Sequence, residues 1–131
     1  MLSIFGAVSA QTAATMKNFE KNKENYIGRP VSDLLKDLPM QIKSFIIIPN
    51  YDNPNYGNEF RFSSHFTGET STLIRANNRP LFLVYVRFSP QIKFPLSGFM
   101  NEYKGQDIYR EHYAEFEQYR IVDISVSTFP R

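Results

Sequence analysis

Three polar side chains that alternate along one segment form the most reactive pattern in the sequence. Arg61, Ser63 and His65 stand two residues apart in a stretch where polar and apolar residues alternate. On a β-strand such residues share one face, where they can bind an anion together or pass a proton between them. The pattern suggests a small hydrolase-like site, but the solvated outer face of a sheet has the same composition.

A turn-rich loop with two tyrosines is the other candidate for ligand binding. It runs Tyr-Asp-Asn-Pro-Asn-Tyr-Gly-Asn from Tyr51 to Asn58. Loop tyrosines offer a flat amphipathic contact surface at low entropic cost, here beside amides that form hydrogen bonds. Tyrosines can also simply pack a loop onto its domain, so both interpretations stay open. The predicted ligand-binding residues are Tyr51, Tyr56, Arg61, Ser63 and His65.

A histidine near the C-terminal end raises the question of a metal site. His112 and Glu115 lie three residues apart, about one helical turn, with Glu111 adjacent. A catalytic zinc usually has three protein ligands, and two at this spacing are common in any charged helix. His112 also borders an aromatic stripe, where a half-buried structural histidine is expected. We predict no metal site, no cofactor and no catalytic residue.

Other catalytic signatures are missing from the sequence. Cysteine is absent, which excludes disulfides, thiolate metal sites and cysteine nucleophiles. There is no Gly-x-Ser-x-Gly elbow, P-loop, dinucleotide fingerprint or His-Glu-x-x-His helix. A net charge of +2 from scattered basic residues gives no reason to expect a nucleic-acid partner.

One α+β domain over residues 11–131 is predicted to position the candidate residues. Two N-terminal helices are expected: a polar one over 11–25, and a short one in which Val31, Leu34, Leu35 and Leu38 fall at helical spacing before Pro39. A further helix is expected over about 105–119, just before the last strand. With 12 Phe, 8 Tyr and 42% hydrophobic residues, the chain can fill a single core.

About five strands in a mostly antiparallel sheet are predicted from period-two patterns and turn signals. They cover residues 41–48, 59–67, 71–76, 81–89 and 120–128. The segment Leu81–Val86 is apolar on both faces, which favours a central place in the sheet. No apolar run is long enough to cross a membrane.

The first ten residues predict export. Leu2–Val8 is apolar, and Val8-Ser9-Ala10 before Gln11 matches the small-residue site that signal peptidase cleaves. No Lys or Arg precedes the apolar run, so an ordinary apolar N-terminus is the alternative interpretation. We expect residues 1–10 to be a signal-peptide remnant and the protein to be periplasmic or secreted.

A resemblance supports this expectation. The stretch Tyr26–Pro39, Tyr-Ile-Gly-Arg-Pro-Val-Ser-Asp-Leu-Leu-Lys-Asp-Leu-Pro, follows a Ser-Ala-Gln cleavage site. It resembles small uncharacterised exported proteins of Bacteroidota. Its glycine, short helix and strand also resemble outer-membrane assembly lipoproteins and β-lactamase-inhibitor-like domains, although the lipobox cysteine of the lipoproteins is absent.

Three functional hypotheses follow. The first is an exported, non-catalytic binding module whose partner is a protein or another component of the cell envelope. The second is a hydrolase-like enzyme that uses Arg61, Ser63 and His65. The third is a cytoplasmic partner protein, such as a toxin-neutralising factor, if residues 1–10 are not cleaved.

Overall fold

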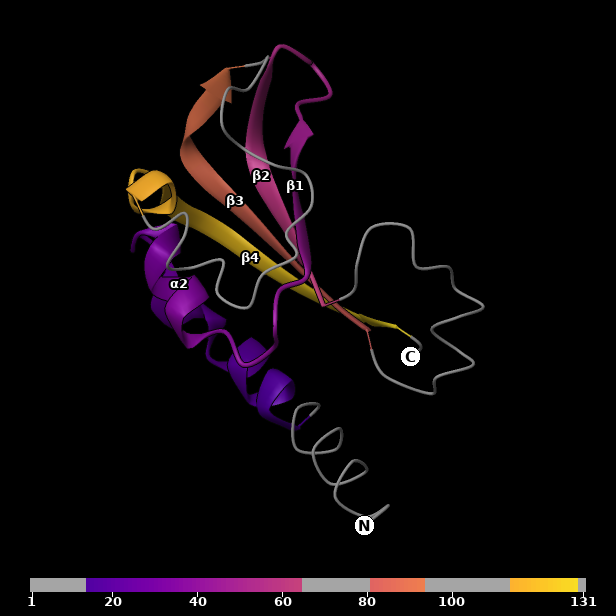
Figure 1. Cartoon of the computed structure of the whole chain (residues 1–131). Coiled ribbons are helices and arrows are strands. Elements are labelled where there is room, and N and C mark those ends of the chain that lie inside the picture. The colour runs from indigo at the N-terminus through magenta and orange to yellow at the C-terminus, as the bar shows by residue number, and fades with distance from the viewer. Residues whose placement is uncertain (1–13, 65–80, 94–113, 130–131) are drawn as a thin grey trace.

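The computed structural model describes residues 14–64, 81–93 and 114–129. They form an α+β fold in which helices cover one face of an antiparallel sheet (Figure 1). The strands of this sheet are β1 (Ser44–Pro49), β2 (Tyr56–Ser63), β3 (Leu81–Lys93) and β4 (Arg120–Phe129), and they are neighbours in that order. The segment that is apolar on both faces lies in β3, between β2 and β4, as the sequence predicts.

Four of the predicted strands lie within the described residues, and their ends are shifted. β1 begins at Ser44, later than expected, whereas β2 already begins at Tyr56. β3 continues to Lys93 because Tyr56 pairs with Lys93 and Gly57 with Ile92. Such a pairing between distant segments has no local sequence signal. The predicted strand over 71–76 lies outside the described residues.

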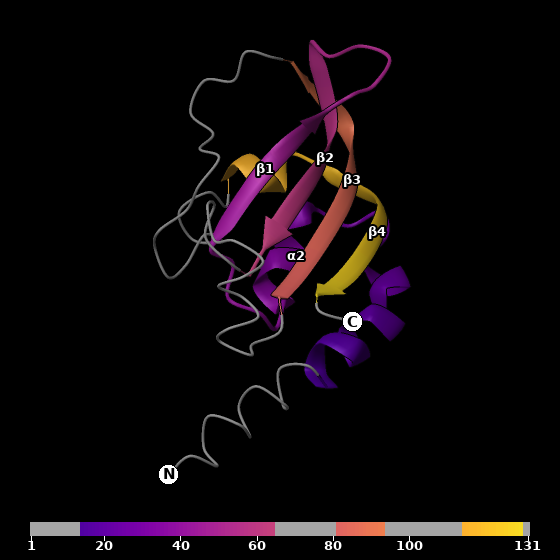
Figure 2. The ribbon, with the colours of Figure 1, turned by 90° about the vertical axis from the view of Figure 1, so that its right-hand side faces the viewer.

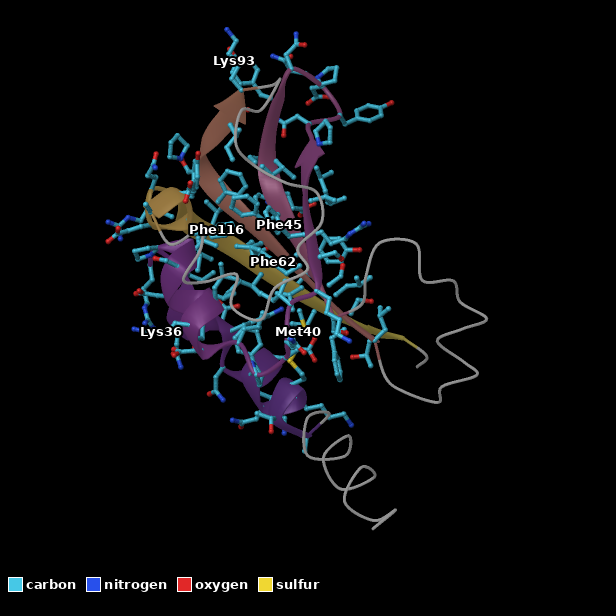
Figure 3. All side chains as sticks on the ribbon, in the orientation of Figure 1. Lys36, Met40, Phe45, Phe62, Lys93 and Phe116 are labelled. Atoms are coloured by element: carbon cyan, nitrogen blue, oxygen red, sulfur yellow. The ribbon has the colours of Figure 1, made fainter. Side chains whose placement is uncertain are left out.

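The core lies between the sheet and the helices. Phe45, Phe62, Val84 and Val126 stand opposite one another across the four strands. Because side chains alternate along a strand, the same face carries the next row, Ile47, Phe60, Val86 and Ile124. Figure 3 shows the rings of Phe45 and Phe62 with that of Phe116, which belongs to the helical residues 114–117. Phenylalanine side chains therefore form the centre of the fold.

The predicted N-terminal helix is divided in two. Residues 14–21 are α-helical, and a 3₁₀ helix, η1 (Lys23–Tyr26), follows. At the break, Asn22 donates its side-chain amide to the Asn18 carbonyl oxygen at 2.8 Å. Asparagine side chains compete with the backbone in this way, which explains why the periodic pattern does not continue as one helix. Met16 and Phe19 are buried against the core.

The second predicted helix is found as α2 (Val31–Asp37). Val31, Leu34 and Leu35 are buried, as their helical spacing predicts. Pro30 precedes the first turn with extended backbone, which suits a residue without a backbone donor. Of the third predicted helix, residues 114–117 are helical, and the part before residue 114 lies outside the described residues.

The segment 28–31, which leads into α2, forms hydrogen bonds with residues 119–121 at the start of β4. Gly28 N donates to Ile121 O at 2.8 Å, Ile121 N donates to Arg29 O at 2.9 Å, and Val31 N donates to Tyr119 O at 2.9 Å. Pro30 and Arg120 form an isolated antiparallel bridge. These bonds join the helical layer to the last strand and fix the position of α2.

Gly28 is the residue that allows this connection. Its φ of 84° lies in the left-handed region, which glycine adopts without steric cost. No atom lies within 4 Å of a Cβ placed there, so a substitution would strain the backbone without a clash. Gly28→Ala is expected to lower the free energy of unfolding by about 1 kcal/mol, measured by urea denaturation. Gly28→Asn should lose less, and a stabilised Gly28→Ala protein would contradict the expectation.

Two tyrosines on the helical side of the molecule have raised pKa values. Burial raises the pKa of Tyr26, and its hydrogen bond to Asp37 Oδ2 at 3.0 Å raises it further. Burial also raises the pKa of Tyr119, helped by the charge of Glu115. The Arg29 guanidinium lies 4.9 Å from the centre of the Tyr26 ring and forms an ion pair with Asp33 at 3.2 Å.

These shifts predict a loss of stability in alkali. The folded state favours the neutral phenol, so its contribution is complete below the ordinary tyrosine pKa of about 10 and is lost as the pH rises through the raised value. The free energy of unfolding of the Tyr26→Phe variant should therefore depend less on pH above about 10 than that of the unmodified protein. Denaturation curves collected across this range measure the difference, and parallel curves would contradict it.

Candidate functional site

The face of the sheet away from α2 carries a row of alternating charge. Ile48, Glu59, Arg87 and Asp123 stand opposite one another on the four strands. They alternate along their strands with core residues, so they point to the opposite face, which we call the outer face. Figure 2 views the sheet from this side, with α2 behind it. Arg87 thus lies between two carboxylates.

A hollow of about 420 Å³ opens where this row meets the loop between β1 and β2. Its size is within the range of small-molecule sites, although it is open and polar where most of them are enclosed. The residues that line it come from the end of β1, the loop and the neighbouring parts of β2 and β3. They are Ile48, Pro49, Asn50, Tyr51, Asp52, Asn53, Asn58, Glu59 and Arg87.

The loop that borders the hollow is held by its own hydrogen bonds. Asn50 N donates to Tyr56 O at 2.8 Å, and Tyr56 N donates to Asn53 O at 3.0 Å. Asn53 Oδ1 accepts from Asn55 N at 3.3 Å, the local bond that makes asparagine a turn former. Asn50 Nδ2 also donates to Gln91 Oε1 at 2.7 Å. The loop is therefore fastened to β3 as well as to β2.

Several side chains of the hollow have no bonding partner. Within the described part of the chain, the side chains of Asn58, Glu59 and Arg87 form no hydrogen bond or ion pair. Glu59 and Arg87 are directly opposite each other on β2 and β3, so a carboxylate acceptor and a guanidinium donor stand side by side with their bonding capacity free. The side chain of Tyr51 is fully exposed, at 101%.

The sequence-predicted site residues are only partly brought together. Tyr51 lines the hollow, whereas Tyr56 begins β2 and is half-buried outside it. Arg61 and Ser63 do share the outer face of β2, as predicted. Ser63, however, is only 2% exposed, and a hydroxyl this buried does not reach a substrate in solvent. His65 lies outside the described residues.

Arg61 lies one row away from the hollow, between Ile46 and Tyr85. Its Nε atom is buried and has no hydrogen-bond partner. A buried donor without a partner is uncommon in folded proteins. Arg61 therefore keeps bonding capacity on the outer face, but the guanidinium that lines the hollow is that of Arg87.

Glu59 and Arg87 are the site residues that sequence reasoning missed, whereas Asn58 ends the loop that the sequence predicts to bind a ligand. Glu59 and Arg87 each look like an ordinary polar residue of a strand, and they are distant in sequence. The alternation of polar residues along β2 and β3 was the available signal. It does not show that Glu59 lies opposite Arg87, because the register of the two strands shifts at an irregularity between Gly57 and Glu59.

Metal and membrane sites find no support in the described residues. No three His, Asp or Glu side chains gather there closely enough to hold a metal ion, and His112 lies outside this part. In the same residues, no helix has both the length and the apolar character needed to span a bilayer.

No family model matches the chain, and no curated protein or solved structure is significantly similar to it. The site must therefore be interpreted from its own chemistry. It offers the donors and acceptors of Asn58, Glu59 and Arg87 together with the exposed side chain of Tyr51. Such groups are available to form hydrogen bonds with a polar ligand.

Proposed function

We propose that this protein is an exported, non-catalytic binding domain of the bacterial cell envelope, with its ligand site in the hollow of the outer face. The observation that carries the proposal is the exposed ring of Tyr51 beside the unpaired side chains of Asn58, Glu59 and Arg87. An exposed aromatic side chain on the same surface as unpaired polar groups is typical of binding sites.

The hydrogen bonds that hold the loop beside the hollow favour ligand binding. Backbone and side-chain bonds fasten the loop to β2 and β3. A surface that is already ordered loses little conformational entropy when a ligand binds. Export is the second part of the proposal, and it rests on the apolar segment and the Val8-Ser9-Ala10 site before Gln11.

Binding is tested by cosedimentation of the purified protein with envelope fractions, namely outer-membrane vesicles and peptidoglycan sacculi. We expect the protein to sediment with one of them and Tyr51→Ala to reduce the bound fraction severalfold, because truncation removes the exposed anchor. Lys36→Ala, an exposed change on α2, is the matched control. Equal binding by Tyr51→Ala and Lys36→Ala would reject the hollow as the site.

The cellular location is tested separately by N-terminal sequencing of the protein from fractionated cells. Export predicts a chain that begins at Gln11, with its glutamine cyclised to pyroglutamate, in the periplasm or the medium. An intact Met1 inside the cell would reject export and would favour a cytoplasmic partner protein.

A further inference from the structure

The charge of the hollow limits the class of ligand that it can accept. Asp52 and Glu59 contribute two carboxylates and Arg87 one guanidinium to its lining, so its formal charge is −1. A phosphate, a nucleic acid or an acidic peptide would be repelled by this balance. The charge balance therefore favours a neutral or cationic ligand.

The unpaired groups match a ligand that both donates and accepts hydrogen bonds. Glu59 offers only acceptors, Arg87 offers only donors, and the Asn58 amide offers both. Because Glu59 and Arg87 are directly opposite each other on adjacent strands, one compact group can reach both. A pair of neighbouring hydroxyls does this, since each hydroxyl donates one hydrogen bond and accepts another.

Tyr51 supplies the remaining part of such a site. Tyr51 lines the hollow, and its side chain is fully exposed at 101%. The negative face of an aromatic ring attracts the positively polarised C–H groups of a sugar ring. Tyrosine presents this face with few rotatable bonds, so little entropy is lost when a ring stacks on it.

We infer that the hollow binds a neutral carbohydrate, with one sugar ring stacked on Tyr51 and its hydroxyls bonded to Asn58, Glu59 and Arg87. This inference rests on the proposed binding function and names the ligand class of the same site. A cationic peptide also suits a charge of −1, and its backbone carbonyls can accept from Arg87, but its positive side chains would be repelled by that guanidinium. A carbohydrate uses every group.

The inference is tested by calorimetry and amide NMR with soluble cello-, manno- and xylo-oligosaccharides at millimolar concentration. At least one of them should bind and shift the amide signals of residues 50–53, 58–59 and 87. Tyr51→Ala should weaken binding about tenfold, whereas Tyr51→Phe should stay within about threefold. Lys36→Ala is the control, and circular dichroism checks that each variant is folded.

Salt and chemical treatment separate a carbohydrate from the other ligand classes. Carbohydrate binding should hardly change with ionic strength, whereas binding of a lysine-rich peptide should weaken as salt screens the charges. Periodate, which cleaves neighbouring diols, should abolish binding to outer-membrane vesicles, and protease treatment should not.

Two results would overturn the inference. One is binding to outer-membrane vesicles that depends on Tyr51 but survives periodate, with no oligosaccharide bound; the proposed binding function would then stand without this ligand class. The other is binding of the peptide alone. Failure of Tyr51→Ala to affect any binding would reject the proposed function itself.

Discussion

Replacing Phe60 with alanine is expected to destabilise the protein by about 3–5 kcal/mol, the usual cost of removing a buried phenylalanine. The Phe60 side chain is fully buried and stacks on Phe88, with ring centres 4.2 Å apart. It also meets the edges of Phe116 at 5.2 Å and Tyr119 at 5.9 Å. Truncation leaves a cavity, because the sheet and the helical residues around it cannot move together enough to fill the space. Urea denaturation followed by circular dichroism measures the loss.

Tyr51→Ala is the matched control for this prediction. It also removes an aromatic ring, but from a side chain that is fully exposed at 101%. Its free energy of unfolding should therefore stay within about 0.5 kcal/mol of the unmodified value. Similar losses for Phe60→Ala and Tyr51→Ala would contradict the position of Phe60 at the centre of the core.

Phe116→Ala is expected to cost a similar amount, about 3–5 kcal/mol. Phe116 comes from the helical residues 114–117 and is fully buried. Its ring packs edge-on against Phe45 at 5.7 Å and Phe62 at 5.7 Å. The side chain therefore fixes the segment that leads into β4. Thermal and urea unfolding of the variant measure the effect, and a stability close to that of the unmodified protein would contradict it.

The two phenylalanines should also show coupling. Because the rings of Phe60 and Phe116 are in contact, the double variant should lose less than the sum of the single losses, by about 0.5–3 kcal/mol. Additive losses would mean that the rings act independently. A double-mutant cycle in urea gives this value directly.

Much of the fold follows from local patterns. The spacing of Val31, Leu34 and Leu35 predicts both α2 and the face it buries. The alternation through Phe60 and Phe62 likewise predicts which face of β2 is in the core. These predictions succeed because periodicity reports burial directly. The ends of strands are harder to predict from sequence, since the early start of β2 depends on its pairing with Lys93 and Ile92, far along the chain.

The candidate site was only half predictable for the same reason. Tyr51 could be chosen from its type and its loop, but Glu59 and Arg87 become neighbours only through the register of β2 and β3. Ser63 illustrates the opposite error. Its polar type suggested a solvated face, yet its side chain is buried, because burial depends on what covers a strand as well as on the strand itself.

The backbone bonds between Gly28 and Ile121 affect how the protein is made. A nascent chain that still lacks residues 120–129 does not yet contain β4. The segment before α2 and the strand β3 both pair with β4, so neither has its hydrogen-bonding partner at that stage. Contacts of such long sequence separation form late, since the loop they close is large. The fold therefore closes only after synthesis has passed β4. Under the proposed export, a polypeptide that reached a secretion channel before that moment would still be unfolded enough to thread through it.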